Sequence, residues 1–114
     1  HGPESLDRLI AAVPFYRPVV MTANTLRGLH ADTAQVGVLN VLVTHERVAR
    51  KMVTEIVSAM AAGASELARL NPLYAGLKSL YEPLRTIGRA AYEIGGVQLH
   101  SGAVKAYRDA GLLT

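Results

Sequence analysis

The stretch Val36-Gly-Val-Leu-Asn-Val-Leu-Val43 is a nearly unbroken apolar octet, and it decides the expected fold. A run of this length fits a β-strand. Because it lacks polar alternation, it fits a strand buried on both faces, as in α/β sheets with helices above and below. Asn40 is the one amide in the run. A buried amide needs hydrogen-bond partners, so Asn40 is expected either to brace a neighbouring loop or to face a polar cavity.

The segment before the octet predicts a second strand and a polar loop. Residues 15–21 are rich in β-forming side chains. Pro18 has no N–H to donate, which indicates an edge strand or one that begins after it, at about residues 19–22. Residues 22–33 are polar and contain Gly28, and they are expected to form a loop.

Helical patterns fill most of the remaining chain, at residues 3–12, 46–62, 65–70, 73–91 and 101–110. Thr44 and Ser101 are expected to cap the second and last of these helices. Gly111 occupies the expected C-terminal stop. The stretch 73–91 contains Pro83 and Gly88 and predicts one kinked helix or two short ones. The expected fold class is therefore α/β and helix-rich, with two principal strands and about five helices.

The size of the chain predicts one domain. Its 114 residues are half apolar, which disfavours disorder and leaves no room for two independent cores. Residues 1–2 resemble the scar of a purification tag, and residues 3–114 are expected to form a single α/β unit. The mean hydropathy of +0.20 indicates apolar surface that meets another domain or subunit.

Charge and composition disfavour several classes of partner and site. The net charge of +3 is dispersed along the chain, with one Phe and no Trp, so no nucleic-acid interface is expected. The sequence has no cysteine, which excludes disulfides, thiolate metal sites and a cysteine nucleophile. No apolar stretch reaches the length of about 18 to 20 residues that a membrane span needs.

No motif for catalysis or for a metal is recognisable. The four histidines, His1, His30, His45 and His100, do not have the spacing that aims two imidazoles at one metal. Gly-x-Ser-x-Gly does not occur, and no glycine-rich phosphate loop is present. His100-Ser101 fits a capped helix start better than a nucleophile and its base. We therefore expect no enzyme activity, no cofactor and no metal site.

Thr22-Ala-Asn-Thr25 is the best cluster of small hydrogen-bonding side chains in the chain. Thr22, Asn24 and Thr25 are the candidate ligand-binding residues, and a polar surface loop without a ligand is the alternative. The five tyrosines are widely spaced and are expected at the edge of the core, with their hydroxyls in water.

Four segments together have a familiar order. They are Val13-Pro-Phe-Tyr-Arg-Pro-Val-Val-Met21, Val36-Gly-Val-Leu-Asn-Val-Leu-Val-Thr44, Leu70-Asn-Pro-Leu73 and Leu99-His-Ser-Gly-Ala-Val-Lys-Ala-Tyr-Arg-Asp-Ala-Gly111. This order resembles the C-terminal third of the solute-binding subunits of TRAP transporters of the TAXI class. The chain departs from that pattern at residues 20–28, where the family has a loop that crosses between the two lobes. This segment lacks two prolines of the pattern and has Leu26 in place of a tyrosine. The chain also has Gln98 and Ser101 where proline is usual.

The resemblance implies the C-terminal portion of a periplasmic-binding-protein (Venus-flytrap) type II-like fold. It implies a periplasmic protein that binds a small anionic solute, such as an amino acid or organic acid, and delivers it to TRAP membrane subunits. Thr22, Asn24 and Thr25 would then line the cleft between two lobes. Sensing of a solute for a regulatory partner is an alternative role within the same class.

The members that the chain resembles are longer, two-lobed clamps. The chain is therefore expected to be either an excised C-terminal piece or a protein that never had the rest. With half of the cleft absent, we expect no solute affinity of the chain alone. We also expect a homo-oligomer that covers its apolar surface. The competing hypothesis is a stand-alone helical interaction module without solute binding.

Overall fold

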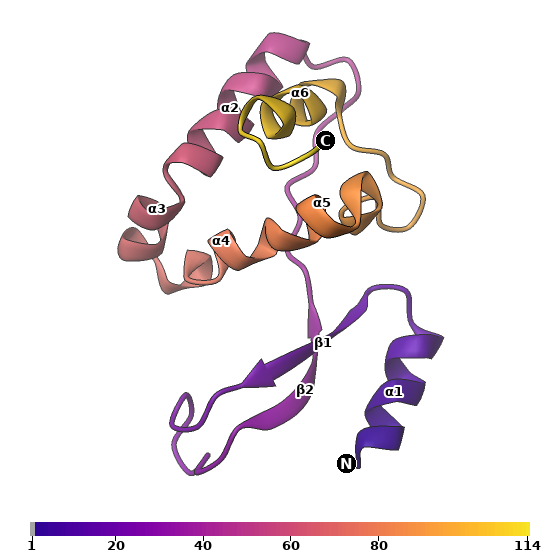
Figure 1. Cartoon of the computed structure of the whole chain (residues 1–114), viewed down its shortest axis with the longest axis vertical. Helices are drawn as coiled ribbons and strands as arrows, with labels where there is room; N and C mark the ends of the chain where they lie inside the picture. The colour runs from indigo at the N-terminus through magenta and orange to yellow at the C-terminus, as the bar shows by residue number, and fades with distance from the viewer. Residues whose placement is uncertain (1) are drawn as a thin grey trace. The chain divides into compact units, whose positions relative to one another are not determined.

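A computed structural model describes residues 2–114 and confirms the helix-rich α/β class. The described residues form six α-helices, two 3-10 helices and one antiparallel pair of strands (Figure 1). Internal contacts divide the chain into two units, His1–Leu42 and Val43–Thr114. The single unit expected over residues 3–114 stays a prediction.

The first unit consists of one helix beside a β-hairpin. Helix α1 (Pro3–Ala12) begins with Pro3, whose missing N–H has no intrahelical partner to lose at this position. Strands β1 (Tyr16–Met21) and β2 (Thr33–Val38) pair antiparallel, from Tyr16 opposite Val38 to Met21 opposite Thr33. Helix α1 contacts both strands of this hairpin.

The second strand differs from its prediction. β2 ends at Val38, whereas the expected strand ran over residues 36–43, and residues 39–45 have no helix or strand. Pairing stops because the register ends at Tyr16 opposite Val38, where β1 begins. Leu42 and Val43 are 77% and 72% exposed, so the prediction of a strand buried on both faces is wrong. Asn40 is also exposed and lies outside the strand, so neither of its expected buried roles is present.

The first strand is longer than predicted. β1 begins at Tyr16, three residues before the expected start at 19, and contains Pro18. A sheet of two strands leaves one edge of each strand unpaired, and such an edge tolerates a residue without an N–H. Gly37 faces Val19 across the sheet, where a Cβ would lie 2.6 Å from the Val19 Cγ1.

The second unit is helical throughout its regular structure. Its elements are α2 (Arg50–Ala62), α3 (Ala64–Leu70), the 3-10 helix η1 (Pro72–Tyr74), α4 (Leu77–Leu80), α5 (Glu82–Thr86), the 3-10 helix η2 (Gly88–Ala91) and α6 (Ser101–Asp109). Helix α2 starts at Arg50 with Ala49 as its N-cap, so the predicted start at residue 46 and the Thr44 cap are wrong. The stretch 73–91 is more broken than predicted, because a new helix begins at Glu82 with Pro83 in its first turn, and Gly88 has a φ of 79°.

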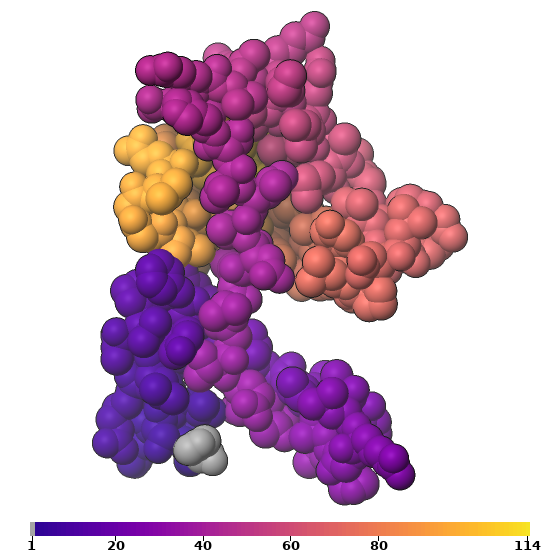
Figure 2. All heavy atoms as spheres, turned by 180° about the vertical axis from the view of Figure 1, so that it is seen from behind, coloured from indigo at the N-terminus to yellow at the C-terminus, as the bar shows by residue number. Residues whose placement is uncertain are grey.

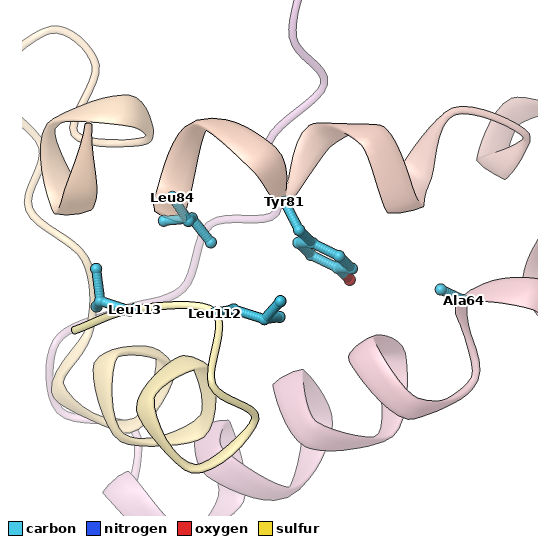
Figure 3. Packing of buried hydrophobic residues seen from close by; sticks show 5 residues of the cluster. All are labelled: Ala64, Tyr81, Leu84, Leu112 and Leu113. Carbon is cyan, nitrogen blue, oxygen red and sulfur yellow. The ribbon is translucent and has the colours of Figure 1, made fainter. Parts of the chain in front are cut away.

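The core of the second unit joins α3, the start of α5 and the C-terminus. Ala64, Tyr81, Leu84, Leu112 and Leu113 form its buried cluster, and Leu84 is fully buried (Figure 3). Helices α2 and α6 pack closely through Gly102 and the small side chains Ala103 and Ala106 of α6. A Cβ on Gly102 would lie 2.5 Å from the carbonyl oxygen of Arg50, so only glycine allows this approach.

Three tyrosines belong to this core, contrary to the prediction that they lie at its edge. Tyr81 is buried, and its ring centroid lies 6.1 Å from that of Tyr107. The ring of Tyr92 meets that of Tyr107 edge to face at 5.9 Å. The Tyr92 hydroxyl donates a hydrogen bond to the carbonyl oxygen of Leu80. Aromatic pairs of this geometry stabilise a fold beyond the area they bury.

Candidate functional site

The predicted ligand-binding residues lie in the connection between β1 and β2, residues 22–32. Backbone hydrogen bonds shape this connection: the Asn24 N–H donates to the Leu29 carbonyl at 2.7 Å, and the Thr25 N–H donates to the Thr22 carbonyl at 3.2 Å. The Ala23 N–H donates to Asp32 Oδ1 at 2.9 Å, which joins the two ends of the connection. The loop predicted over residues 22–33 is therefore present with a defined internal structure, apart from its last residue, which opens β2.

The structure brings two of the three candidate residues together. The hydroxyls of Thr22 and Thr25 lie 2.9 Å apart and share a hydrogen bond. Asn24 has a φ of 65°, a left-handed conformation that asparagine tolerates better than most residues. Within residues 2–114 its side-chain amide makes no hydrogen bond. All three residues are exposed, so their polar groups are open to an approaching molecule.

Two further residues define what this connection can bind. Asp32 is its one carboxylate and already accepts the Ala23 N–H, whereas Arg27 is an exposed cation in the same connection. Neither residue was among the predicted ligand-binding residues, although a charged residue flanking a polar loop is a visible signal. Leu26, which replaces the aromatic residue of the resembled pattern, is 57% exposed. In Figure 2 the hairpin projects from α1 as a narrow finger, and this connection forms its end.

Hydroxyls, an amide and a guanidinium suit a polar or anionic ligand. The Thr22–Thr25 pair has lone pairs and one free proton, and the Asn24 amide can donate and accept. Arg27 supplies donors for a carboxylate. In the described part of the chain, no group of three or more His, Asp or Glu side chains is placed to hold a metal ion.

His100, in the last of the four resembled segments, contributes to helix packing. His100, rather than the predicted Ser101, is the N-cap of α6: its Nδ1 accepts the Gly102 N–H at 3.0 Å. Its Nε2 lies 3.1 Å from the carbonyl oxygen of Val48 and donates to it when Nδ1 is the acceptor. Thr54 Oγ1 donates to the Gly102 carbonyl at 3.1 Å. His100 therefore ties α6 to the segment before α2, and both ring nitrogens are used.

Burial shifts the pKa values of Tyr92 and Tyr107 in the second unit more than those of other groups. Desolvation, together with the neighbouring Tyr81, raises the pKa of Tyr107 to about 12, and burial raises the pKa of Tyr92 still further. The pKa of Glu93 is lowered because its carboxylate accepts the Leu99 N–H and pairs with Arg89. Tyr92 and Tyr107 pack against the core of the second unit, and none of these groups belongs to the β1–β2 connection.

Among the helices described, none combines the length and the apolar character that a bilayer span requires. No curated protein matches the chain. The model of the NMT1-like family, however, matches residues 2–111, which is nearly the whole chain. This family resembles the periplasmic binding proteins, is related to the solute-binding proteins of TRAP transporters and is typically extracytoplasmic. On the extent of this match, the chain belongs to the NMT1-like family.

Proposed function

We propose that the chain acts in the periplasm as a solute-binding component of a TRAP-type secondary transporter of the TAXI class. The observation that carries this proposal is the family match over residues 2–111. The four TAXI-like segments support the narrower class. The first segment covers β1, the third spans the break before η1 and the fourth covers α6. The second segment begins in β2 and continues past its end at Val38.

The proposed solute is a small anion, such as an amino acid or an organic acid. Thr22, Asn24 and Thr25 would contact it, and Arg27 would balance its charge. Support comes from the exposure of all four side chains in one connection. In a clamp of this kind, the ligand favours the closed state by its extra contacts there, and the closed form is delivered to the membrane subunits.

Calorimetry tests the solute and the site together. The gene product that contains this chain is titrated with amino acids and dicarboxylic acids. We expect Asn24→Ala to weaken binding by roughly tenfold, because it removes a neutral hydrogen-bonding group from a polar contact. Gln35→Ala, an exposed amide in β2, is the matched control and is expected to leave the affinity unchanged. Unchanged affinity in Asn24→Ala removes Asn24 from the site.

The second candidate is a helical interaction module, which exposed apolar side chains favour. Leu70, Leu73 and Ile87 are each about two-thirds exposed, and Val20 in β1 is 65% exposed. Surfaces of this kind associate in water. We propose that the chain forms a homo-oligomer through the face of residues 73–91 and the β1 edge. Light scattering that gives a monomer of 12.2 kDa at high concentration would contradict this.

The two candidates differ in what they bind. A solute-binding component shows a calorimetric signal with a small acid and loses it with Asn24→Ala. An interaction module shows no such signal, and its mass falls on dilution.

A further inference from the structure

A groove of about 590 Å³ lies within the unit Val43–Thr114, between α2, the α4–α5 pair and α6. Four alanines and a leucine provide its apolar lining: Ala61, Ala62, Ala106, Ala110 and Leu112. Methyl side chains leave room for a ligand to approach the helices closely. The volume is in the range of about 300 to 1,000 Å³ that is typical of small-molecule sites.

Charged side chains at this groove leave one cation unneutralised. Arg85 Nη1 pairs with Glu82 at 3.2 Å, and Asp109 pairs with Lys105 at 2.6 Å. Lys78 also lines the groove, and within residues 2–114 no carboxylate lies within ion-pair distance of its ammonium. A ligand with one negative charge would complete this arrangement.

Tyr81 adds a hydroxyl that is free to bind a ligand in this groove. The residue is 7% exposed and lines the groove, but its hydroxyl has no hydrogen-bond partner in the described residues. In the described residues, every fully buried side-chain oxygen or nitrogen has a hydrogen-bond partner. The Tyr81 hydroxyl has none, so it must be accessible to solvent. Figure 3 shows the ring directed away from its helix, past Leu112 and toward Ala64, with the hydroxyl at its far end. Burial raises the pKa of Tyr81, so the hydroxyl keeps its proton as a donor.

We infer that this groove binds an amphipathic monocarboxylate, with its apolar body against the alanines and its carboxylate near Lys78 and the Tyr81 hydroxyl. The groove belongs to the second unit alone, whereas the proposed solute site lies in the β1–β2 connection, so octanoate binding and the proposed transport role can be tested independently.

Nuclear magnetic resonance of the ¹⁵N-labelled chain with octanoate tests the inference. We expect octanoate to shift the amide signals of Ser58, Ala62 and Lys78, and to leave those of residues 22–32 unchanged. Octylamine has the same chain length and the opposite charge, so it should shift the groove amides far less. Equal shifts with octylamine would contradict recognition of a carboxylate. Shifts confined to residues 22–32 would contradict binding in the groove.

Three variants separate the contributions of charge, hydroxyl and space. Lys78→Ala should raise the Kd for octanoate by about fivefold, in line with an exposed ion pair. Tyr81→Phe should raise it by about threefold and leave thermal stability unchanged, because the hydroxyl has no partner to lose. Ala62→Phe fills the groove from an exposed position and should abolish binding.

Lys51→Ala is the matched control, since Lys51 is an exposed lysine of α2 that does not line the groove. If Lys51→Ala weakens octanoate binding as much as Lys78→Ala, general charge attraction replaces the site and the inference fails. Shifts of the groove amides on raising the protein concentration without octanoate would show that a second copy covers the groove, which also overturns it.

Discussion

The two units of the chain contain similar apolar residues, but only one of them buries any. All eight buried apolar side chains belong to Val43–Thr114, and none belongs to residues 2–42. The first unit has one helix against two strands, which is too few layers to enclose a side chain fully. The second unit surrounds Leu84 with several helices. Burial therefore follows the number of layers around a segment more than the hydrophobicity of the segment itself.

The largest expected effect comes from the centre of the second unit. Leu84→Ala should lower the free energy of unfolding by about 3 kcal/mol, because it leaves a cavity where Leu84 is now fully buried. Thermal unfolding followed by circular dichroism measures it. Leu26→Ala in the first unit is the control, with a change below about 0.5 kcal/mol. A similar loss in both variants would contradict the difference between the units.

The contact between α2 and α6 is expected to be nearly as sensitive. Gly102→Ala places a Cβ 2.5 Å from the Arg50 carbonyl and 2.8 Å from the Val53 Cβ, so the helices must separate. We expect a loss of about 2 to 3 kcal/mol in urea unfolding. Gly76→Ala is the matched control, because its new Cβ would meet nothing closer than Ser79 Oγ at 3.8 Å. A tolerated Gly102→Ala would mean that α6 can pack farther from α2.

Alkaline pH should destabilise the second unit through its tyrosines. The pKa of Tyr107 rises from 10.0 in the unfolded chain to about 12 in the fold. Between these values the unfolded chain releases its proton while the folded chain keeps it, so stability is complete below pH 10 and falls as the pH rises to 12. We expect a loss of about 2 kcal/mol over this range. Tyr107→Phe should make this dependence shallower without removing it, because burial also raises the pKa of Tyr92. A flat profile in the unchanged chain would contradict the raised pKa of these tyrosines.

The smallest effect is expected in the β1–β2 connection. Thr25→Ala removes the hydroxyl pair with Thr22, but both residues are exposed and water replaces the lost partner. The free energy of unfolding should change by less than about 0.5 kcal/mol. Amide hydrogen exchange in β1 and β2 should also stay unchanged. A large change would mean that this connection stabilises the hairpin, and its variants could then not report on ligand binding alone.

Local signals in the sequence predicted most of the helices. Helix α3 ends at Leu70, as the Asn71-Pro72 pair predicts, and α6 ends before Gly111, whose φ is 67°. These boundaries depend on the chemistry of neighbouring residues, which a single sequence contains. The start of α2 was predicted too early because Ala49 caps it without a side-chain hydrogen bond. The start of α6 at residue 101 is confirmed, but its cap is the His100 ring in place of a hydroxyl.

Long-range structure was harder to predict. The extent of β2 depends on where β1 begins, and the burial of its extension depends on layers that no local pattern reveals. Likewise, the tyrosine cluster joins residues far apart in the chain. At the candidate site, the polar composition of residues 22–25 was visible. The hydrogen bond from Ala23 to Asp32 was not, because it spans the whole connection.

The packing role of His100 determines what the motif His-x-Gly-Ala, residues 100–103, can reveal about ancestry. Its imidazole bonds to two backbone groups, Gly102 allows the close contact with α2, and Ala103 is buried, so each of these positions serves packing. A packing requirement persists while ligands change. We therefore expect the motif to identify proteins that share this fold by common ancestry, whereas divergence in residues 22–32 would reflect changes in the bound solute.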